Sequence, residues 1–179
     1  MGGNYMNQLT ALSVSIAVLG GIWAFLALGP LSGFVLVWAG FVAWGCYFHT
    51  GGDDAALKKT IAGNIYGAFI AWIALNIIVN VAMPALGTVW PALVVGVTVF
   101  FLVIVAGNQL LSAVPANVYG YAATVAYALH HKPAEGAGPL DSLLSVSMAN
   151  PLILLSVSMV AGAVFGMVSC KAAGALAKK

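Results

Sequence analysis

The fold is decided by residues 60–131, TIAGNIYGAFIAWIALNIIVNVAMPALGTVWPALVVGVTVFFLVIVAGNQLLSAVPANVYGYAATVAYALHH, which contain no Asp, Glu, Lys or Arg. Residues 1–52 and 142–170 are two further stretches without these side chains. Each stretch exceeds the about 20 apolar residues that one transmembrane helix needs. Because helices satisfy their own backbone hydrogen bonds in lipid, the pattern predicts an all-α membrane protein.

The composition excludes most soluble functions. Of the 179 residues, 63% are hydrophobic and 6% are charged, whereas a soluble domain has roughly 25% charged residues. The net charge of +2 comes from six basic and four acidic residues, which is too sparse for a surface that binds nucleic-acid phosphates. We therefore exclude a nucleic-acid-binding protein and a soluble two-domain enzyme, and expect the lipid bilayer to be a partner.

Proline and glycine divide the apolar stretches into helices. Gly29-Pro30, Pro84 and Pro115 mark breaks, since proline lacks an N–H and is suited to a helix start. We predict a polytopic bundle forming one transmembrane domain over 1–179, with six helices near 9–29, 31–48, 60–83, 91–111, 114–131 and 151–170. Residues 141–149 are expected to form either an interfacial helix or the first part of a long kinked helix.

The lysines predict the orientation of the bundle. Six crossings place only Lys132 on one side of the membrane and five lysines on the other, namely Lys58, Lys59, Lys171, Lys178 and Lys179. The positive-inside rule then places the N- and C-termini in the cytoplasm. If 114–131 were a re-entrant loop, the lysines would be divided equally between the two sides, so the bias favours six crossings.

Small residues spaced four apart predict where helices pack closely. Such stripes pack helices within one chain or between chains, and both alternatives stay open; their number leads us to expect a homo-oligomer. The four stripes are Ser13/Ala17/Gly21, Gly63/Gly67/Ala71, Ala116/Gly120/Thr124/Ala128 and Ser158/Gly162/Gly166/Cys170.

Uncharged polar residues are the candidates for a solute path. Two segments share the pattern Asn-[Ile/Val]-Tyr-Gly, at 64–67 and 117–120, which indicates either an internal repeat or a coincidence in a chain rich in Gly and Ala. Their amide and phenol groups suit a neutral or weakly ionised solute better than a bare ion. The alternative is that they only form hydrogen bonds between helices. The candidate path-lining residues are Asn64, Tyr66, Asn76, Asn80, Asn117, Tyr119, Tyr121 and Thr124.

The histidines suggest a second, pH-dependent role. His130 and His131 are candidates for a pH gate at the extracytoplasmic mouth, because imidazole titrates near physiological pH; the alternative is that they are solvated interfacial side chains. The spacing of His, Cys, Asp and Glu gives no metal site and no catalytic group, so we expect neither cofactor nor enzymatic activity.

Short motifs built from glycine and aromatic residues recur along the chain. They are Gly21-Ile22-Trp23, Trp38-Ala39-Gly40-Phe41, Tyr47-Phe48, Gly51-Gly52, Leu57-Lys58 and Leu111-Ser112-Ala113-Val114-Pro115. These motifs resemble those of an uncharacterised bacterial inner-membrane family whose enterobacterial member is called YcdZ. The resemblance covers most of the chain, is strongest over 8–60, and implies a multi-pass protein of the bacterial inner (cytoplasmic) membrane. It implies no activity and no functional residues.

Two functions are compatible with these observations. The first is an oligomeric channel or facilitator for a small solute such as urea, an amide, a small organic acid or a gas. The predicted helix cores contain no ionisable carboxylate, lysine or arginine, which argues against a proton-coupled pump. The second is a non-transporting subunit that scaffolds or regulates a larger inner-membrane complex.

Overall fold

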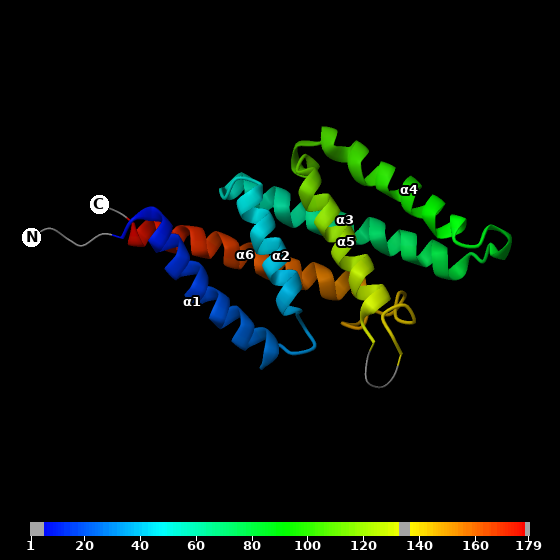
Figure 1. Cartoon of the computed structure of the whole chain (residues 1–179), viewed down its shortest axis with the longest axis horizontal. Helices are drawn as coiled ribbons and strands as arrows, with labels where there is room; N and C mark the ends of the chain where they lie inside the picture. The colour runs from blue at the N-terminus through cyan, green and yellow to red at the C-terminus, as the bar shows by residue number, and fades with distance from the viewer. Residues whose placement is uncertain (1–5, 133–136, 178–179) are drawn as a thin grey trace, which may run out of the picture.

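The computed structural model describes residues 6–132 and 137–177, and their regular structure is helical apart from an isolated bridge between Ser32 and Val35 (Figure 1). Six α-helices form the bundle, and the connections contain short 3-10 helices. The α-helices are α1 (Gln8–Leu28), α2 (Val37–His49), α3 (Asp54–Asn80), α4 (Val89–Ile104), α5 (Val114–His130) and α6 (Pro151–Leu176), and the 3-10 helices are η1 (Pro84–Leu86), η2 (Val105–Gly107) and η3 (Gln109–Leu111).

Four helices are long and apolar enough to cross a membrane: Gln8–Leu28, Asp54–Asn80, Val89–Gly107 and Pro151–Leu176. The predicted all-helical, membrane-type fold is therefore confirmed at this level. The helices α2 and α5 contain 13 and 17 residues, which is fewer than the about 20 residues that a crossing normally needs.

Several helix boundaries differ from the sequence prediction. The second helix begins at Val37 and not at residue 31, because Gly33 adopts a positive φ of 83° in the turn after Pro30. The third begins earlier, at Asp54, because the Asp53 side chain caps it by accepting a hydrogen bond from the Ala56 N–H. The fourth ends at Ile104, where the chain tightens into η2 and η3.

The predicted helix over 141–149 is not formed, since these residues make turns. The Asn150 amide explains the difference. Its Nδ2 donates to the carbonyls of Leu143 and Ser145, both at 2.9 Å, and its Oδ1 accepts from the Leu152 N–H at the start of α6. The residue folds the preceding segment back on itself and caps α6, which starts a new helix at Pro151.

Connections gather at two ends of the bundle. At the proximal end, the start of α1, the α2–α3 turn and the end of α6 line a cavity of about 710 Å³. A second proximal cavity, of about 260 Å³, brings the end of α2 beside the α4–α5 connection. The distal end contains the 29–36 segment beside the end of α5, and residues 137–150 (Figure 1). Consecutive helices therefore run in alternating directions.

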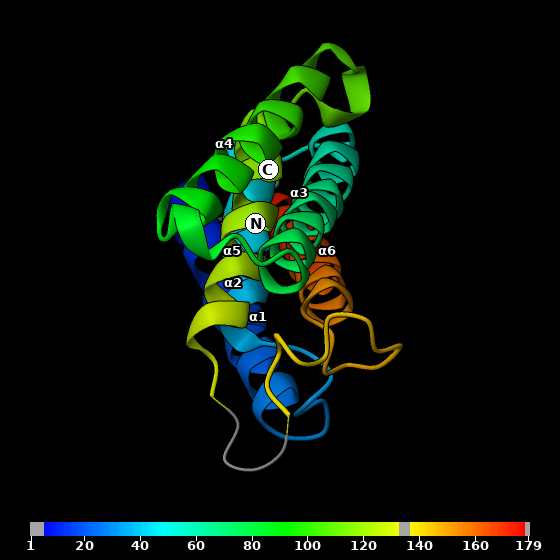
Figure 2. The same cartoon turned by 90° about the vertical axis from the view of Figure 1, so that its right-hand side faces the viewer.

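The core consists of a central cluster flanked by two outer clusters. The central cluster joins α2, α5 and α6 through buried residues that include Ala43, Leu155 and Met159. The α1-side cluster surrounds Trp23 and Trp44, and the α4-side cluster surrounds Leu102 and Tyr121. Figures 1 and 2 show α1 and α4 at opposite outer edges, with α3 and α6 between them.

The small-residue stripes divide into two groups. Those on α3, α5 and α6 are buried within the chain, apart from the half-buried Cys170. The stripe Ser13/Ala17/Gly21 on α1 is exposed, and a Cβ added at Gly21 would meet no atom within 4 Å. Close packing inside the chain therefore accounts for three of the four stripes.

Candidate functional site

The two Asn-x-Tyr-Gly segments face each other where α3 crosses α5. Gly67 lies against the backbone carbonyl of Asn117, and Gly120 lies against the backbone carbonyl of Asn64. A Cβ at either glycine would overlap the opposite carbonyl oxygen, so only glycine permits this approach. The crossing thus brings Asn64 and Asn117, two of the predicted path-lining residues, to one place.

The two asparagines differ in how their side chains are satisfied. Asn117 is fully buried, and its Nδ2 donates to the carbonyls of Leu102 at 3.2 Å and Leu111 at 3.1 Å. Its Oδ1 has no hydrogen-bond partner among the described residues. Asn64 is 1% exposed, and neither its Nδ2 nor its Oδ1 has a partner in the described part of the chain. A buried amide without partners costs about 1–3 kcal/mol for each unpaired group.

A line of hydroxyl groups leads from the proximal end towards Asn64. Thr60 lies one turn before Asn64 on α3 and is fully buried, with its Oγ1 3.5 Å from the Thr50 Oγ1. Thr50 donates onward to the Cys46 carbonyl at 2.8 Å. Thr50 also lines the smaller proximal cavity, together with His49, Lys59, Ser112, Ala113 and Pro115. Thr50 therefore links the cavity to Thr60, which lies one helical turn from Asn64.

Tyr119 belongs to the same region. Its hydroxyl lies 3.3 Å from the Nδ1 of His49, which lines the smaller proximal cavity. The two rings meet edge to face, with centroids 6.3 Å apart. Tyr119 is thus associated with the mouth of the cavity, and Asn64 lies deeper in the bundle.

The other predicted path residues are not brought to Asn64 by their hydrogen bonds. Tyr66 donates to the Phe101 carbonyl on α4 at 2.9 Å, and Tyr121 shares a hydrogen bond of 3.0 Å with Thr98 on α4. Within their own helices, the remaining three donate to carbonyls four residues earlier: Thr124 to Gly120, Asn76 to Trp72 and Asn80 to Asn76. Each of these five side chains thus makes a hydrogen bond to protein, two of them between helices and three within one helix.

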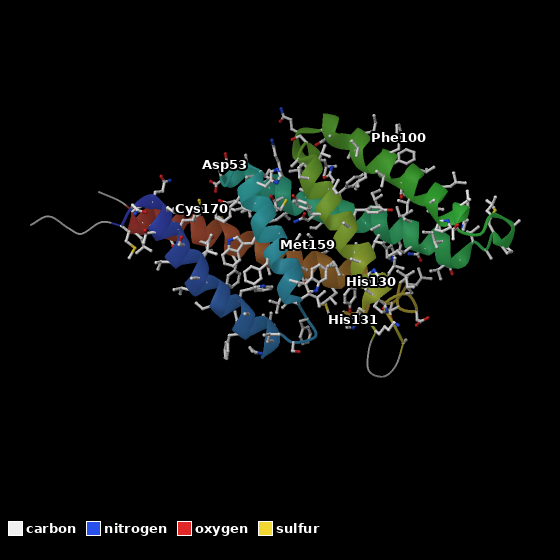
Figure 3. The ribbon with its side chains drawn as sticks, viewed as in Figure 1. Asp53, Phe100, His130, His131, Met159 and Cys170 are labelled. Carbon is white, nitrogen blue, oxygen red and sulfur yellow. The ribbon has the colours of Figure 1, made fainter. Side chains whose placement is uncertain are left out.

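His130 and His131 lie at the distal end, away from the proximal cavity (Figure 3). Both are exposed and line a cavity of about 410 Å³ with Leu36, Trp38, Ala126 and Tyr127. The His131 ring stacks on Tyr127 with centroids 4.8 Å apart. Their role as a pH gate stays a prediction. In the described ranges, no three His, Cys, Asp or Glu residues are grouped to hold a metal ion.

Sequence reasoning missed Thr60 and Thr50. The spacing of Thr60 and Asn64 by one helical turn was available as a signal, since residues four apart share a helix face. Thr50 carried no such signal. It reaches the site only because α2 and α3 are joined by a turn at Gly51 and Gly52, which both adopt positive φ.

A family model described as protein of unknown function (DUF1097) matches residues 13–174, which is nearly the whole chain. Comparison with curated proteins and with solved structures gives no match.

Proposed function

Since the chain belongs to DUF1097, a family of unknown function, its activity has to be argued from its own residues, and we propose that it is a membrane facilitator for a small neutral or weakly ionised solute. Urea, short amides and small organic acids in their uncharged form are the solute class. The single observation that carries the proposal is the buried Asn64 amide, whose two side-chain polar atoms have no partner among the described residues. Asn64 lies one helical turn from Thr60, whose hydroxyl is 3.5 Å from that of Thr50 in the lining of the smaller proximal cavity.

The proposal places the bundle across the bacterial inner membrane with six crossings. The alternating helix directions support it, as do Lys58, Lys59 and Lys171, which lie towards the proximal end, while Lys132 lies at the distal end. The proximal end then faces the cytoplasm by the positive-inside rule. The helices α2 and α5 are short for a crossing, and in this proposal the adjoining segments 29–36 and 105–113, the second of which contains η2 and η3, extend them.

The chemistry of Asn64 selects the solute. A side-chain amide donates through Nδ2 and accepts through Oδ1, so a molecule that both accepts and donates hydrogen bonds satisfies it completely. Residues 60–131 and 142–170 contain no ionic side chain that would balance a desolvated ion. A neutral solute is therefore stabilised by hydrogen bonds to Asn64, whereas an ion at the same place has no opposite charge to balance it.

Solute flux and thermal stability measured on the same preparation test the proposal. In liposomes, we expect urea or acetamide to enter faster than into empty vesicles, and Asn64→Leu to lower that flux by about tenfold. The substitution should leave the melting temperature unchanged or raised, because it removes an unsatisfied buried group.

The matched control is Asn76→Leu, since Asn76 only donates to a carbonyl of its own helix. It should leave flux unchanged. Flux that equals that of empty liposomes would contradict the proposal, and so would an Asn64→Leu protein that is as permeable as the wild type.

The chain is also proposed to form a homo-oligomer, with the exposed Ser13/Ala17/Gly21 stripe on α1 as the available packing surface. The same stripe supports the second candidate, a non-transporting subunit of a larger complex. Native mass spectrometry from mild detergent distinguishes them: a symmetric ring or dimer of this chain supports the facilitator. A constant stoichiometry with another protein, without flux, supports the subunit.

A further inference from the structure

We infer that the chain consists of two inverted three-helix repeats, α1–α3 and α4–α6, and that Leu155 and Met159 of α6 form the apolar barrier opposite the polar pair Thr60 and Asn64 of α3. The barrier rests on the proposed function, because it closes the solute path towards the distal end. The repeat rests on packing alone and is tested separately.

The helix contacts are the same in both halves when α1, α2 and α3 are exchanged with α4, α5 and α6. The helix α3 packs against α5 and α4 of the second half, and α6 packs against α2 and α1 of the first half. The two third helices also contact each other. The third helix of each half thus packs mainly against the first two helices of the other half.

Two backbone approaches fix the register of the repeat. Gly67 of α3 lies against the carbonyl oxygen of Asn117 on α5, and Gly162 of α6 lies against the carbonyl oxygen of Gly40 on α2. Superposing these contacts aligns Gly67 with Gly162 and Asn117 with Gly40. The next residues, Ala68 and Ala163, are both fully buried.

Further positions agree with this register. The residues four before and four after the central glycine are small in both helices: Gly63 and Ala71 on α3, and Ser158 and Gly166 on α6. The residue four after the other contact is a buried aromatic in both halves, Tyr121 after Asn117 and Trp44 after Gly40. Tyr121 belongs to the α4-side cluster, and Trp44 to the α1-side cluster.

The repeats run in opposite directions because each has three helices, an odd number. The helix α3 starts at the proximal end, whereas α6 starts at the distal end. Residues that precede Gly67 therefore lie on the proximal side of the crossing, and residues that precede Gly162 lie on the distal side. The pseudo-two-fold axis lies between them.

In this register, two polar residues of α3 correspond to two apolar residues of α6. Thr60 and Asn64 precede Gly67 by the same intervals at which Leu155 and Met159 precede Gly162. Leu155 and Met159 are fully buried in the central cluster, against which Leu57 and Ile61 of α3 pack. Figure 3 shows Met159 at the middle of the bundle. The proximal half of the proposed path is polar, and the distal half is closed by aliphatic side chains.

An apolar constriction closes a path by excluding water, so a polar group placed there should admit solute. We therefore expect Met159→Asn, which gives the distal half the counterpart of Asn64, to raise urea flux at least about fivefold. Leu155→Thr, the counterpart of Thr60, is the second variant and should raise flux if Met159→Asn fails to fold. Val157→Asn, which adds the same amide on an exposed face of α6, is the matched control and should leave flux at the wild-type level.

The outcomes separate the inferences. Wild-type flux that neither polar variant raises would overturn the barrier and leave the proposed function standing. No wild-type flux would overturn the proposed function and the barrier together. The repeat is then decided by Gly67→Ala and Gly162→Ala, which should reduce the yield of folded protein to the same extent. If one variant folds like the wild type and the other does not, the repeat is wrong.

Discussion

The crossing of α3 with α5 and the crossing of α2 with α6 share a backbone geometry but differ in their side chains. At both, a glycine lies against a carbonyl oxygen of the other helix. At the α2–α6 crossing, aromatic rings fill the surroundings: Trp23 covers Gly40, and Trp44 and Tyr47 cover Gly166. At the α3–α5 crossing, the side-chain amides of Asn64 and Asn117 lie between the helices, and three of their polar atoms lack hydrogen-bond partners in the described residues.

The difference between the two crossings shows which residues are needed to pack the helices and which are not. The aromatic crossing is satisfied, since Trp23 Nε1 donates to the Val37 carbonyl at 2.9 Å and Trp44 Nε1 donates to Ser169 at 3.0 Å. It shows that the same backbone approach can be packed without unpaired polar atoms. The amides of the other crossing are therefore not needed to bring the helices together.

The largest expected effect comes from removing the glycines that permit the approaches. Gly67→Ala and Gly162→Ala should each lower the free energy of unfolding by about 3 kcal/mol or more, because a Cβ would overlap backbone that has no room to move. Thermal unfolding in detergent measures the loss. Gly45→Ala and Gly96→Ala are the controls, since a Cβ there meets nothing within 4 Å; a comparable loss in these variants would remove the contrast.

The next effect distinguishes the two asparagines. Asn117→Ala should lower the free energy of unfolding by about 1–2 kcal/mol, because its Nδ2 donates to two carbonyls that hold the α4–α5 connection. Asn64→Ala should cost less, since it breaks no hydrogen bond within the described chain. The melting temperatures of the two variants test this order, and equal losses would show that Asn64 is also structural.

A smaller effect is expected at the aromatic crossing. Trp44→Phe keeps a ring over Gly166 but removes the hydrogen bond to Ser169, so it should cost about 1 kcal/mol. Solute flux per folded molecule should stay the same. Chemical denaturation and liposome flux on one preparation measure both quantities, and a changed solute preference would place part of the path at this crossing.

The smallest effect is expected at the surface. Lys171 and Asp54 form an ion pair of 3.8 Å whose side chains are 67% and 82% exposed. Such pairs contribute little because water and salt screen them. Asp54→Asn should therefore leave the melting temperature unchanged within error. A clear loss would mean that the proximal ends of α3 and α6 are held together by charge.

The sequence predicted the helices whose apolar stretches were long and whose ends carried standard signals. The second helix was predicted to start too early, because Pro30 suggested a helix start, whereas Gly33 adopts a positive φ and the Leu36 N–H donates to Ser158 of α6. A helix was also predicted over 141–149. The structure has turns there, because the Asn150 side chain donates to the carbonyls of Leu143 and Ser145. The first error concerns a segment that contacts a helix distant in the sequence, and the second concerns hydrogen bonds between residues only five and seven positions apart.

The candidate site was predicted in part. The shared Asn-x-Tyr-Gly pattern drew attention to Asn64 and Asn117 as possible members of an internal repeat. The structure places them against each other, and the inferred repeat pairs α3 with α6 instead. Sequence similarity between Gly67-Ala68 and Gly162-Ala163 is too short to detect without knowing which carbonyls the glycines meet.

The exchange of third helices has a consequence for biosynthesis. The helices α1 and α2 leave the ribosome well before α6, yet α6 is the partner that lies against Gly40. In contrast, α3 finds α4 and α5 immediately after it in the chain. The group α3, α4 and α5 is thus available for packing before the group α1, α2 and α6, and Trp23 and Trp44 meet Phe165 only after α6 has been made.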